Sequence, residues 1–468
     1  MELQKRTRAF SPCRRRLLLG SALATLTIAT GHKAYAAQTT PALRHLVARR
    51  GTAQLAPSPH PGTGIWGYNG AVPGPELRLR QGERLRVSVE NLLDEETTVH
   101  WHGIRLPNAM DGVPHLTQKP IAANGGKFLY EFDVPDAGTY WYHPHQRSFE
   151  QVARGLYGAL IVEEHEPPVV DRDITWILDD WRLDRDASIR GGFGNYMDLS
   201  HAGRIGNTVT VNGKIAEAFA VRAGERIRLR LINAANARIF ALEFSGHNPR
   251  IIALDGQPVV PHEPESGRIV LGPAMRGDII LDMTGQPGQR YGVTDPFYRR
   301  LAYRLLDLVY AAEPLRAKPP ETEIRLPANK LPEPDLAVAR HHEVLFSGGM
   351  MGNMRGMSRG MAWAINGVSQ SEHVHEPLLV LQRNSSNVLR LVNDTAWHHP
   401  IHLHGHSFRV ISRNGKPTRH REWLDTVLVA PRETTEIAFV ADNPGDWMFH
   451  CHILEHQAAG MMSAIRVA

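Results

Sequence analysis

The sequence has 468 residues, which at roughly 150 residues per domain predicts about three domains. Hydrophobic residues make up 42% of it and no low-complexity tract is present, so the composition excludes a largely disordered chain. The net charge is +5, but residues 1–36 carry seven basic residues and one acidic residue, a net +6, which leaves −1 for the rest. The charge therefore gives no argument for a nucleic-acid partner or an acidic membrane surface.

Residues 1–36 are typical of an export signal. Arg14-Arg15-Arg16 precedes an apolar run from Leu17 to Ala29, and Ala34-Tyr35-Ala36 is an A-x-A cleavage signal. The run is too short to span a bilayer, so we expect no stable membrane insertion. The arginines followed by two leucines resemble the twin-arginine signal, although its usual Ser and Phe are missing. We expect a periplasmic protein, exported by the twin-arginine machinery or by the general secretory route.

The chain beyond this segment repeats one pattern three times: an Asn-Gly turn, then an alternating strand that ends at Asn. The turns are Asn69-Gly70, Asn212-Gly213 and Asn366-Gly367, and the strands end at Asn91, Asn233 and Asn393. Short alternating runs are common and long helical patterns are scarce, which predicts an all-β fold. We expect domains at 37–165, 170–312 and 322–468, with joints at Pro167-Pro168 and Pro319-Pro320.

The first and third repeats carry paired histidines at equivalent positions. Nine and eleven residues past the final Asn stand His100 and His102, then Leu242 and Phe244, then His402 and His404. Five and seven residues past Gly138, Gly288 and Gly445 stand His143 and His145, then Val293 and Asp295, then His450 and His452. We therefore expect the first and last domains to share a metal site, with the middle domain acting mainly as a spacer.

Strand parity predicts a second site beside the first. Residues two apart on a strand share a face, so Cys451 points away from His450 and His452. By the same rule His399 opposes the pair 402/404, whereas His398 has the wrong parity for a ligand. With His456 and Met461 from the following loop, His399 and Cys451 make the His2Cys-thioether set of a blue copper centre. Cys13 leaves with the leader, so Cys451 forms no internal disulfide and acts as a thiolate ligand.

Two other interpretations of the histidines are weaker. Buried core histidines do not explain four H-x-H pairs at equivalent positions, one of which flanks the only mature cysteine. A zinc site does not explain them either, because eight histidines exceed one tetrahedral shell.

These motifs together resemble those of the multicopper oxidases, the family of laccases, cuprous oxidases and bilirubin oxidases, over nearly the whole mature chain. The resemblance implies three cupredoxin-like Greek-key β-barrels and four copper ions. Carried over motif by motif, His399, Cys451 and His456 bind the type 1 copper with Met461 axial, and His100 and His402 bind the type 2 copper. The type 3 pair is bound by His102, His143, His145, His404, His450 and His452.

The resemblance also implies a mechanism. An external donor gives single electrons to the type 1 copper, and Cys451 conducts them to its neighbours His450 and His452. Four transfers reduce one O2 to two waters. Asp111, nine residues past His102, resembles the family's proton-relay carboxylate; the alternative is an ordinary Asp-Gly turn residue. A second relay acid, usual in the cuprous oxidases, is Gln457 here, with Glu455 nearby.

The electron donor is left open. Met350, Met351, Met354, Met357 and Met361 form a thioether-rich segment that suits Cu(I), or packs as the face of a helix, although its glycines disfavour one. Thr395 and Trp397 stand where cuprous oxidases carry Asp and Met for substrate copper, and Asp394 is shifted by one. Two functions remain: an oxidase of phenols, aromatic amines or Cu(I), or a copper-sequestering tolerance protein with incidental turnover. The intact ligand set argues against the family's structural members, which lack ligands.

Overall fold

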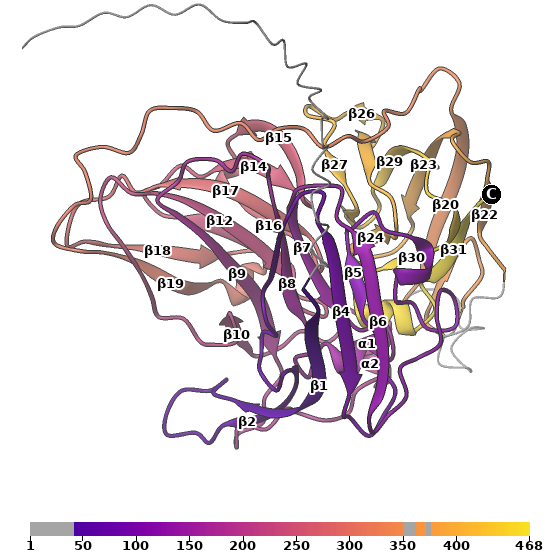
Figure 1. The fold of residues 1–468 in the computed structure, drawn as a ribbon, viewed down its shortest axis with the longest axis horizontal. Helices are drawn as coiled ribbons and strands as arrows, with labels where there is room; N and C mark the ends of the chain where they lie inside the picture. Colours follow the sequence, from indigo (N-terminus) through magenta and orange to yellow (C-terminus); the bar gives the residue numbers. More distant parts are fainter. Residues whose placement is uncertain (1–41, 351–360, 371–375) are drawn as a thin grey trace, which may run out of the picture. The chain divides into compact units, whose positions relative to one another are not determined.

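The computed structural model describes residues 42–350, 361–370 and 376–468. These residues form three units, each built from two β-sheets (Figure 1), and the all-β prediction is confirmed. The predicted leader and most of the methionine segment, residues 351–360, lie outside the described residues. Within the described ranges, no helix has the length and apolar character to cross a membrane.

The first unit packs a sheet of strand order β2-β1-β4-β6 against one of order β3-β8-β7-β5. β1 pairs with β4 in parallel, and β5 with β7 antiparallel. The elements are β1 (Arg44–Ala53), β2 (Thr63–Tyr68), β3 (Leu77–Arg80), β4 (Arg84–Asn91), β5 (His100–His102), η1 (Asn108–Met110), β6 (Gly126–Asp133), β7 (Gly138–His143), α1 (Ser148–Gln151) and β8 (Gly158–Glu163).

The middle unit has sheets of order β10-β9-β12-β17-β14-β15 and β11-β19-β18-β13-β16. Its elements are β9 (Arg172–Trp181), α2 (Tyr196–Ser200), β10 (Thr208–Val211), β11 (Ala218–Val221), β12 (Arg226–Asn233), β13 (Phe240–Phe244), β14 (Arg250–Leu254), β15 (Gln257–His262), η2 (Glu265–Gly267), β16 (Ile269–Leu271), β17 (Arg276–Asp282), β18 (Arg290–Asp295), η3 (Arg299–Leu301) and β19 (Tyr303–Tyr310). Leu242, Phe244 and Val293, which replace the histidines of the other units, are buried in its own hydrophobic core.

The third unit has sheets of order β21-β20-β23-β29-β25-β26, with β27 paired to β25, and β22-β31-β30-β24-β28. Its elements are β20 (Arg340–Gly348), β21 (Trp363–Ile365), β22 (Leu379–Leu381), β23 (Ser386–Asn393), β24 (His399–Leu403), β25 (Phe408–Arg413), β26 (Lys416–Pro417), β27 (Trp423–Leu424), β28 (Thr426–Val429), β29 (Thr434–Val440), β30 (Gly445–Cys451), α3 (Leu454–Ala458) and β31 (Met462–Val467). Helix α3 contacts both α1 and α2, so it touches the other two units.

The repeated asparagines have the same structural task in every unit. Asn69, Asn212 and Asn366 adopt positive φ angles of 58°, 52° and 48° before a glycine of positive φ, the geometry of a tight turn that asparagine and glycine tolerate best. The asparagines that end the long strands are buried, and each accepts a bond from the backbone N–H two residues on. Those bonds join Leu93 to Asn91 at 3.1 Å, Ala235 to Asn233 at 3.0 Å and Thr395 to Asn393 at 3.0 Å. The repeat in the sequence is therefore a repeat in the fold.

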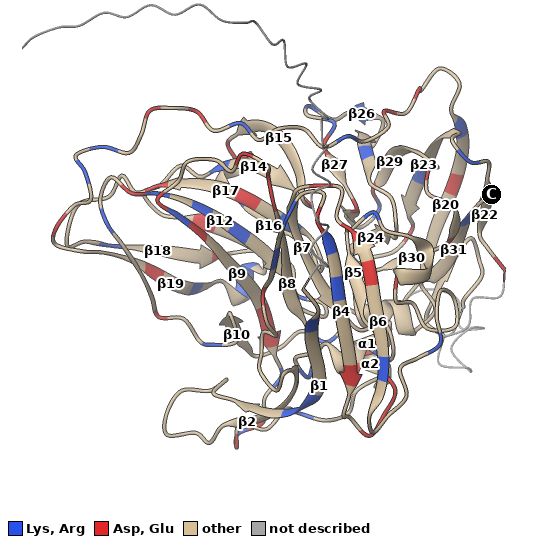
Figure 2. Ribbon diagram, viewed as in Figure 1, with Lys and Arg blue, Asp and Glu red and all other residues tan. Residues whose placement is uncertain are grey.

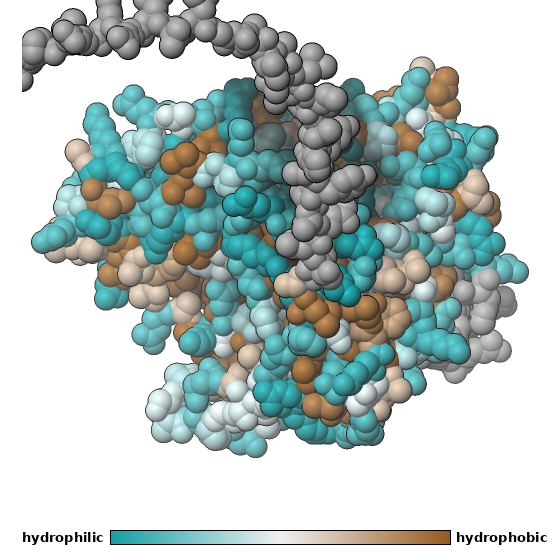
Figure 3. All heavy atoms as spheres, in the orientation of Figure 1, coloured by the Kyte–Doolittle hydropathy of each residue, from teal (hydrophilic) through white to brown (hydrophobic). Residues whose placement is uncertain are grey.

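The apolar residues of the alternating strands face inward and form the cores between the sheets. One hydrophobic cluster runs through the first and third units, and a second fills the middle unit. The molecular face shown in Figure 3 is mostly hydrophilic, with hydrophobic residues scattered over it. The first and third units thus share a continuous core, and the strands that carry the histidine motifs lie in it.

Candidate metal centre

Two antiparallel strand pairs bring the histidine motifs together. β5 and β7 place His100 opposite His143 in the first unit, and β24 and β30 place His402 opposite His450 in the third. Opposed residues share a face, and so do residues two apart along a strand. All eight histidines of the four motifs are at most 5% exposed: His100, His102, His143, His145, His402, His404, His450 and His452.

The eight rings lie close together, and among their contacts are two sets of three imidazoles with similar spacing. The ring centroids of His102, His143 and His452 lie 5.0–5.7 Å apart. Those of His145, His404 and His450 lie 4.9–5.2 Å apart. Each group takes histidines from both the first and the third unit, so neither unit alone completes one.

The remaining two histidines, His100 and His402, have matching hydrogen bonds. The rings of His100 and His402 lie 5.8 Å apart. His100 Nδ1 is 2.8 Å from the backbone oxygen of Asp111, and His402 Nδ1 is 2.8 Å from that of Asp425. Each carbonyl holds one ring nitrogen as a donor, which leaves each Nε2 as an acceptor, and neither Nε2 has a hydrogen-bond partner.

The contacts within the triads fit a cation between the rings. His404 Nε2 lies 3.1 Å from His450 Nε2, and His143 Nε2 lies 3.4 Å from His452 Nε2. The opposite nitrogen of His450 is held 2.9 Å from the oxygen of Cys451, and that of His143 is 3.1 Å from the oxygen of Pro144. At the His404–His450 contact both Nδ1 atoms are held by acceptors, so two Nε2 lone pairs face each other and repel, whereas a shared metal ion would attract both.

The protonation of these rings also fits metal binding. Burial lowers the pKa of each triad histidine well below its ordinary value, and neighbouring histidines lower it further in every one. The imidazoles are therefore neutral at physiological pH, which is the form that ligates a metal.

A second cluster lies on the other side of β30, as the strand parity predicts. Cys451 Sγ is 3.6 Å from His399 Nδ1 and 3.7 Å from His456 Nδ1, and these two nitrogens are 3.2 Å apart. All three side chains are fully buried. Burial raises the pKa of the Cys451 thiol, so a metal is needed to favour the thiolate. The three donors can hold one ion in a trigonal arrangement.

The backbone of Met461 flanks this cluster. Its N–H donates to the oxygen of His456 at 2.9 Å, and its carbonyl accepts from Cys451 at 3.0 Å. The Met461 side chain is fully buried in the same hydrophobic cluster as Cys451. His398, by contrast, packs its ring against Phe297 at 5.5 Å and joins neither histidine cluster.

Asp111, just after η1, is buried against the histidines. Its carboxylate oxygens are 2.9 and 3.1 Å from His404 Nδ1, and one of them is 3.2 Å from His100 Nδ1. The residue does precede Gly112, whose φ is +82°, so it belongs to a turn as well. The carboxylate nevertheless contacts two candidate ligands directly.

Sequence reasoning missed Asp425 and Thr426, which contact the candidate ligands from the start of β28. His102 Nε2 lies 3.1 Å from Asp425 Oδ1 and 3.1 Å from Thr426 Oγ1, which leaves His102 Nδ1 without a protein partner. Burial favours the neutral acid, but Arg276 and His402 outweigh it and hold the pKa of Asp425 well below its ordinary value. The one local signal is an acid inside the apolar run 423–429.

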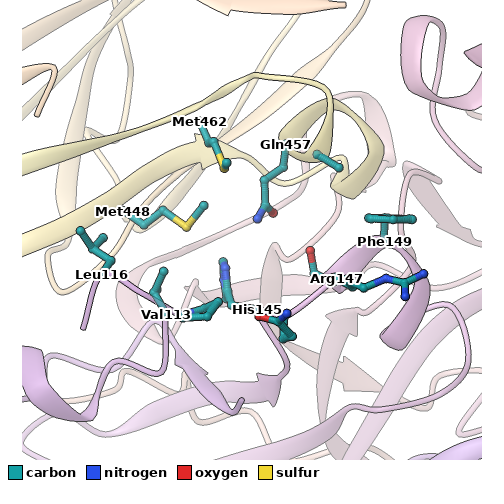
Figure 4. Close-up of a pocket in the computed structure, with 12 residues that line it drawn as sticks. Val113, Leu116, His145, Arg147, Phe149, Met448, Gln457 and Met462 are labelled. Carbon is teal, nitrogen blue, oxygen red and sulfur yellow. The ribbon is translucent and has the colours of Figure 1, made fainter. Parts of the chain in front are cut away.

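The two polar residues beside His456 face different surroundings. Glu455 accepts a bond of 2.8 Å from Asn236 of the middle unit, and burial raises the pKa of its carboxyl to about 7. Gln457 lines a cavity that reaches His145, where neither ring nitrogen has a partner. Figure 4 shows Gln457, Met448 and Met462 on one side of this cavity and His145, Val113 and Arg147 on the other.

Comparison with known proteins gives consistent matches along the chain. Multicopper oxidase family models match residues 51–167, 172–317 and 347–468. Multicopper oxidase MmcO of Mycobacterium tuberculosis is 33% identical over 441 residues, covering 85% of this chain and 82% of that protein. Laccase-1 of Botryotinia fuckeliana is 30% identical over 439 residues, covering 84% and 77%. The crystal structure of a multi-copper oxidase from Pseudomonas thermotolerans superposes with a TM-score of 0.83 at 35% identity, covering 91% of this chain and 99% of that one.

Proposed function

The chain belongs to the multicopper oxidase family, and from this premise we propose which residues hold the copper ions and what each one does. As a member, it couples one-electron oxidations of a reducing substrate to the reduction of O2 to two waters. When bound, the copper ions supply the one-electron steps. The residues of the chain hold the ions, orient them, move protons and exclude water.

We assign four ions to four groups of donors. His399, Cys451 and His456 would hold the type 1 copper, with the thioether of Met461 as a further donor. His100 and His402 hold the type 2 copper through their unpartnered Nε2 atoms. The two triads hold one type 3 copper each: His102, His143 and His452 the first, and His145, His404 and His450 the second. The observation that carries this proposal is the pair of buried Nε2–Nε2 contacts at 3.1 and 3.4 Å.

The chain itself connects the two centres. Cys451 belongs to the type 1 cluster, and its covalent neighbours His450 and His452 belong to one triad each. The path consists of covalent bonds within β30 and just past its end, so it is the same whichever donor is used. Cys451 therefore has two tasks, as a copper ligand and as the conductor of electrons to the oxygen site.

The cavity that reaches His145 is the route we propose for O2. Leu116, Met448 and Met462 make much of its wall apolar, which suits a small neutral molecule. Arg147 adds a cation, and none of the lining residues in the described part of the chain is an acid. Gln457 cannot take up and release a proton as an acid does, so this route supplies oxygen and not protons.

Asp111 is the residue we propose for proton delivery, and its substitution gives a testable prediction. Asp111→Asn keeps an oxygen that accepts from His404 but cannot relay protons, so reoxidation of the reduced enzyme by O2 slows about a hundredfold. Anaerobic reduction of the type 1 copper needs only an electron and stays fast. Stopped-flow absorbance follows both steps, with copper content measured on the same sample.

The matched control is Asp136→Asn, a buried first-unit acid whose partner is Arg105 at 2.7 Å and which contacts no histidine of the cluster. It should reoxidise at the wild-type rate. Asparagine is well tolerated before glycine in a turn. If Asp111→Asn is reoxidised at the normal rate, Asp111 serves only as a turn residue.

Protein groups cover the type 1 cluster, and the electron donor approaches from outside this cover. His456 Nε2 is 2.6 Å from the backbone oxygen of His201, and His399 Nε2 is 2.8 Å from Thr395 Oγ1. The outer edges of both ligands are thus occupied by protein groups. A phenol, an aromatic amine or Cu(I) therefore gives its electron through this cover and not by direct contact with a ligand.

Copper sequestration with incidental turnover is the second candidate, because exposed thioethers lie in this cover. Met197 is 58% exposed and Met350 is 48% exposed, and the N–H of Met350 donates to the oxygen of Ser200 in α2. Soft thioethers suit Cu(I). The predicted thioether segment continues into residues outside the described ranges.

Steady-state O2 consumption tests the proposed function and separates the two candidates. The oxidase should contain four copper ions per chain and consume one O2 for every four electrons from a phenol or from Cu(I), without releasing peroxide. Leucine at Met350, Met351, Met354, Met357 and Met361 keeps the apolar size, so it should leave phenol turnover unchanged and lower Cu(I) turnover only. A chain that binds copper but consumes no O2 with either donor would be a sequestering protein.

We further propose export to the periplasm, on the strength of residues 1–36 in the sequence. The arginine run, the apolar run and the A-x-A site together support it. A fusion of these residues to a reporter, assayed in strains that lack one export route or the other, identifies the machinery.

A further inference from the structure

The middle unit carries arginines that are completely buried, although it supplies none of the proposed copper ligands. Arg228, Arg230 and Arg276 are 0% exposed and lie on the adjacent strands β12 and β17. Figure 2 shows basic and acidic positions side by side on these strands. A buried charge is costly unless it is paired, so each partner identifies what the arginine holds.

Arg228 and Arg230 pair with acids that do not touch the histidines. Arg228 binds Glu164 with two bonds of 2.9 and 2.8 Å and reaches Asp278 at 2.7 Å. Arg230 binds Asp173 at 2.6 and 2.8 Å. The Arg228–Glu164 contact joins the middle unit to the end of the first unit, whereas Asp173 belongs to β9 of the middle unit. Among the described residues, neither arginine bonds directly to a residue that contacts the histidines.

Arg276 is different, because its partner is a residue that contacts the histidines. Its two terminal nitrogens bind both carboxylate oxygens of Asp425, at 2.8 and 2.6 Å, across 149 residues of sequence. Its Nε donates to the backbone oxygen of Thr139 at 3.1 Å. One planar guanidinium of the middle unit thus contacts the first and third units at once.

A second residue of the middle unit holds the backbone around Asp425. Asp255 accepts from the N–H groups of Asp425 and Thr426 at 3.2 and 3.0 Å. Its other oxygen accepts from the N–H of Arg276 at 2.9 Å. The carboxylate of Asp425 is therefore held by the guanidinium fork and its peptide by Asp255, both from the middle unit.

Asp425 in turn orients two proposed ligands through hydrogen bonds. Its Oδ1 lies 3.1 Å from His102 Nε2, and its backbone oxygen lies 2.8 Å from His402 Nδ1. These two bonds set which ring nitrogen is left free: Nδ1 in His102 and Nε2 in His402. A small rotation of Asp425 would move both free nitrogens together.

We propose that Arg276 of the middle unit is a positioning residue for the type 2 copper and the adjacent type 3 copper, acting through Asp425 on His402 and His102. The inference rests on the proposed copper assignments. It gives the ligand-free middle unit a task beyond separating its neighbours, because the geometry of the oxygen site depends on a side chain that only the middle unit supplies. The acceptor bonds also make the ligand imidazoles more basic.

The identity of the residue at position 276 matters as well as its charge. Asp425 is held by two parallel bonds, and only a guanidinium offers a planar fork of that geometry. Lysine at 276 would keep the positive charge but reach one carboxylate oxygen, which frees Asp425 to rotate.

Arg276→Lys tests this inference against a matched control, Arg228→Lys. Both arginines belong to the middle unit and are fully buried, and each binds a carboxylate of another unit with two hydrogen bonds. Each copper-loaded variant is dialysed against graded chelator, and two signals are followed: type 2 electron paramagnetic resonance and type 1 blue absorption. Loss of such an outer partner typically weakens metal affinity about 10- to 100-fold. In Arg276→Lys the type 2 signal should disappear at about that much less chelator, while the blue absorption persists.

The possible outcomes separate the two levels of the proposal. Arg228→Lys should lower thermal stability but leave both signals at wild-type chelator concentrations. If Arg276→Lys behaves like Arg228→Lys, the arginine is only a structural clamp and the inference is overturned. If the wild-type chain itself shows no type 2 signal, the copper assignment fails first, which is a distinct result.

A second variant keeps the test decisive if Arg276→Lys does not fold. Asp425→Asn retains the side-chain shape and an oxygen for His102, but it loses the charge that the fork binds. It should lose the type 2 signal selectively, as Arg276→Lys does. Retention of wild-type affinity for the type 2 copper in Asp425→Asn would overturn the inference.

Discussion

Cys451→Ser removes the blue absorption and abolishes turnover, while most of the other copper stays bound. Cys451 places a soft donor, charged as the thiolate, within 3.7 Å of both His399 and His456. A serine hydroxyl stays protonated and binds copper poorly. The eight histidines of the other centre keep their positions, because serine is smaller than cysteine and the backbone of β30 is unchanged. Visible absorption, copper content and O2 consumption measure the three effects.

The control for this variant is Cys13→Ser, at the other cysteine of the sequence. Cys13 lies in the predicted leader, so the exported protein should be blue and fully active. A Cys451→Ser protein that remains blue would end the type 1 assignment. One that loses all its copper would show that the two centres do not form independently.

His399→Ala and His398→Ala should have opposite outcomes although the residues are neighbours. His399 Nδ1 faces the Cys451 thiol, so its removal abolishes the blue absorption and turnover. His398 is partly buried against Phe297 and reaches neither cluster, so its removal should change activity less than about twofold, as for most substitutions away from functional features. Each variant is the control for the other.

Absorption and turnover of both proteins, purified side by side, give the measurement. Strand parity and the spacing H-x-x-H-x-H select position 399, and the register of β24 against β30 places Ile401 opposite Cys451. An inactive His398→Ala variant together with an active His399→Ala variant would require a bulge in β24 and a ligand other than His399.

The histidine motifs could be interpreted from the sequence because they lie on strands. A strand alternates its side chains with a period of two, so the side on which Cys451 lies relative to His450 follows from counting. The repeats allowed a second inference, that the first and third units carry the ligands. The residues at the equivalent positions of the middle unit, Leu242 and Phe244, are apolar and buried in its core.

Residue spacing in the sequence could not decide the role of Asp111. An Asp before a Gly in a loop is an ordinary turn residue, and the turn is indeed present. Only the approach of the third unit brings His404 within 2.9 Å of its carboxylate. The contact of His456 with His201 could not be predicted either, because His201 belongs to another unit and lies 255 residues earlier in the chain.

The sequence by itself was sufficient to predict the all-β fold, the family and the two-sided arrangement of donors on β30. These features depend on local rules, the period of a strand and the chemistry of a ligand set, which hold within a few residues. The tertiary structure alone showed that the eight histidines of the first and third units lie together, and that Arg276 contacts Asp425. Such contacts join units far apart in the chain, and a buried ion pair leaves no periodic pattern, because its partners need to be close only in space.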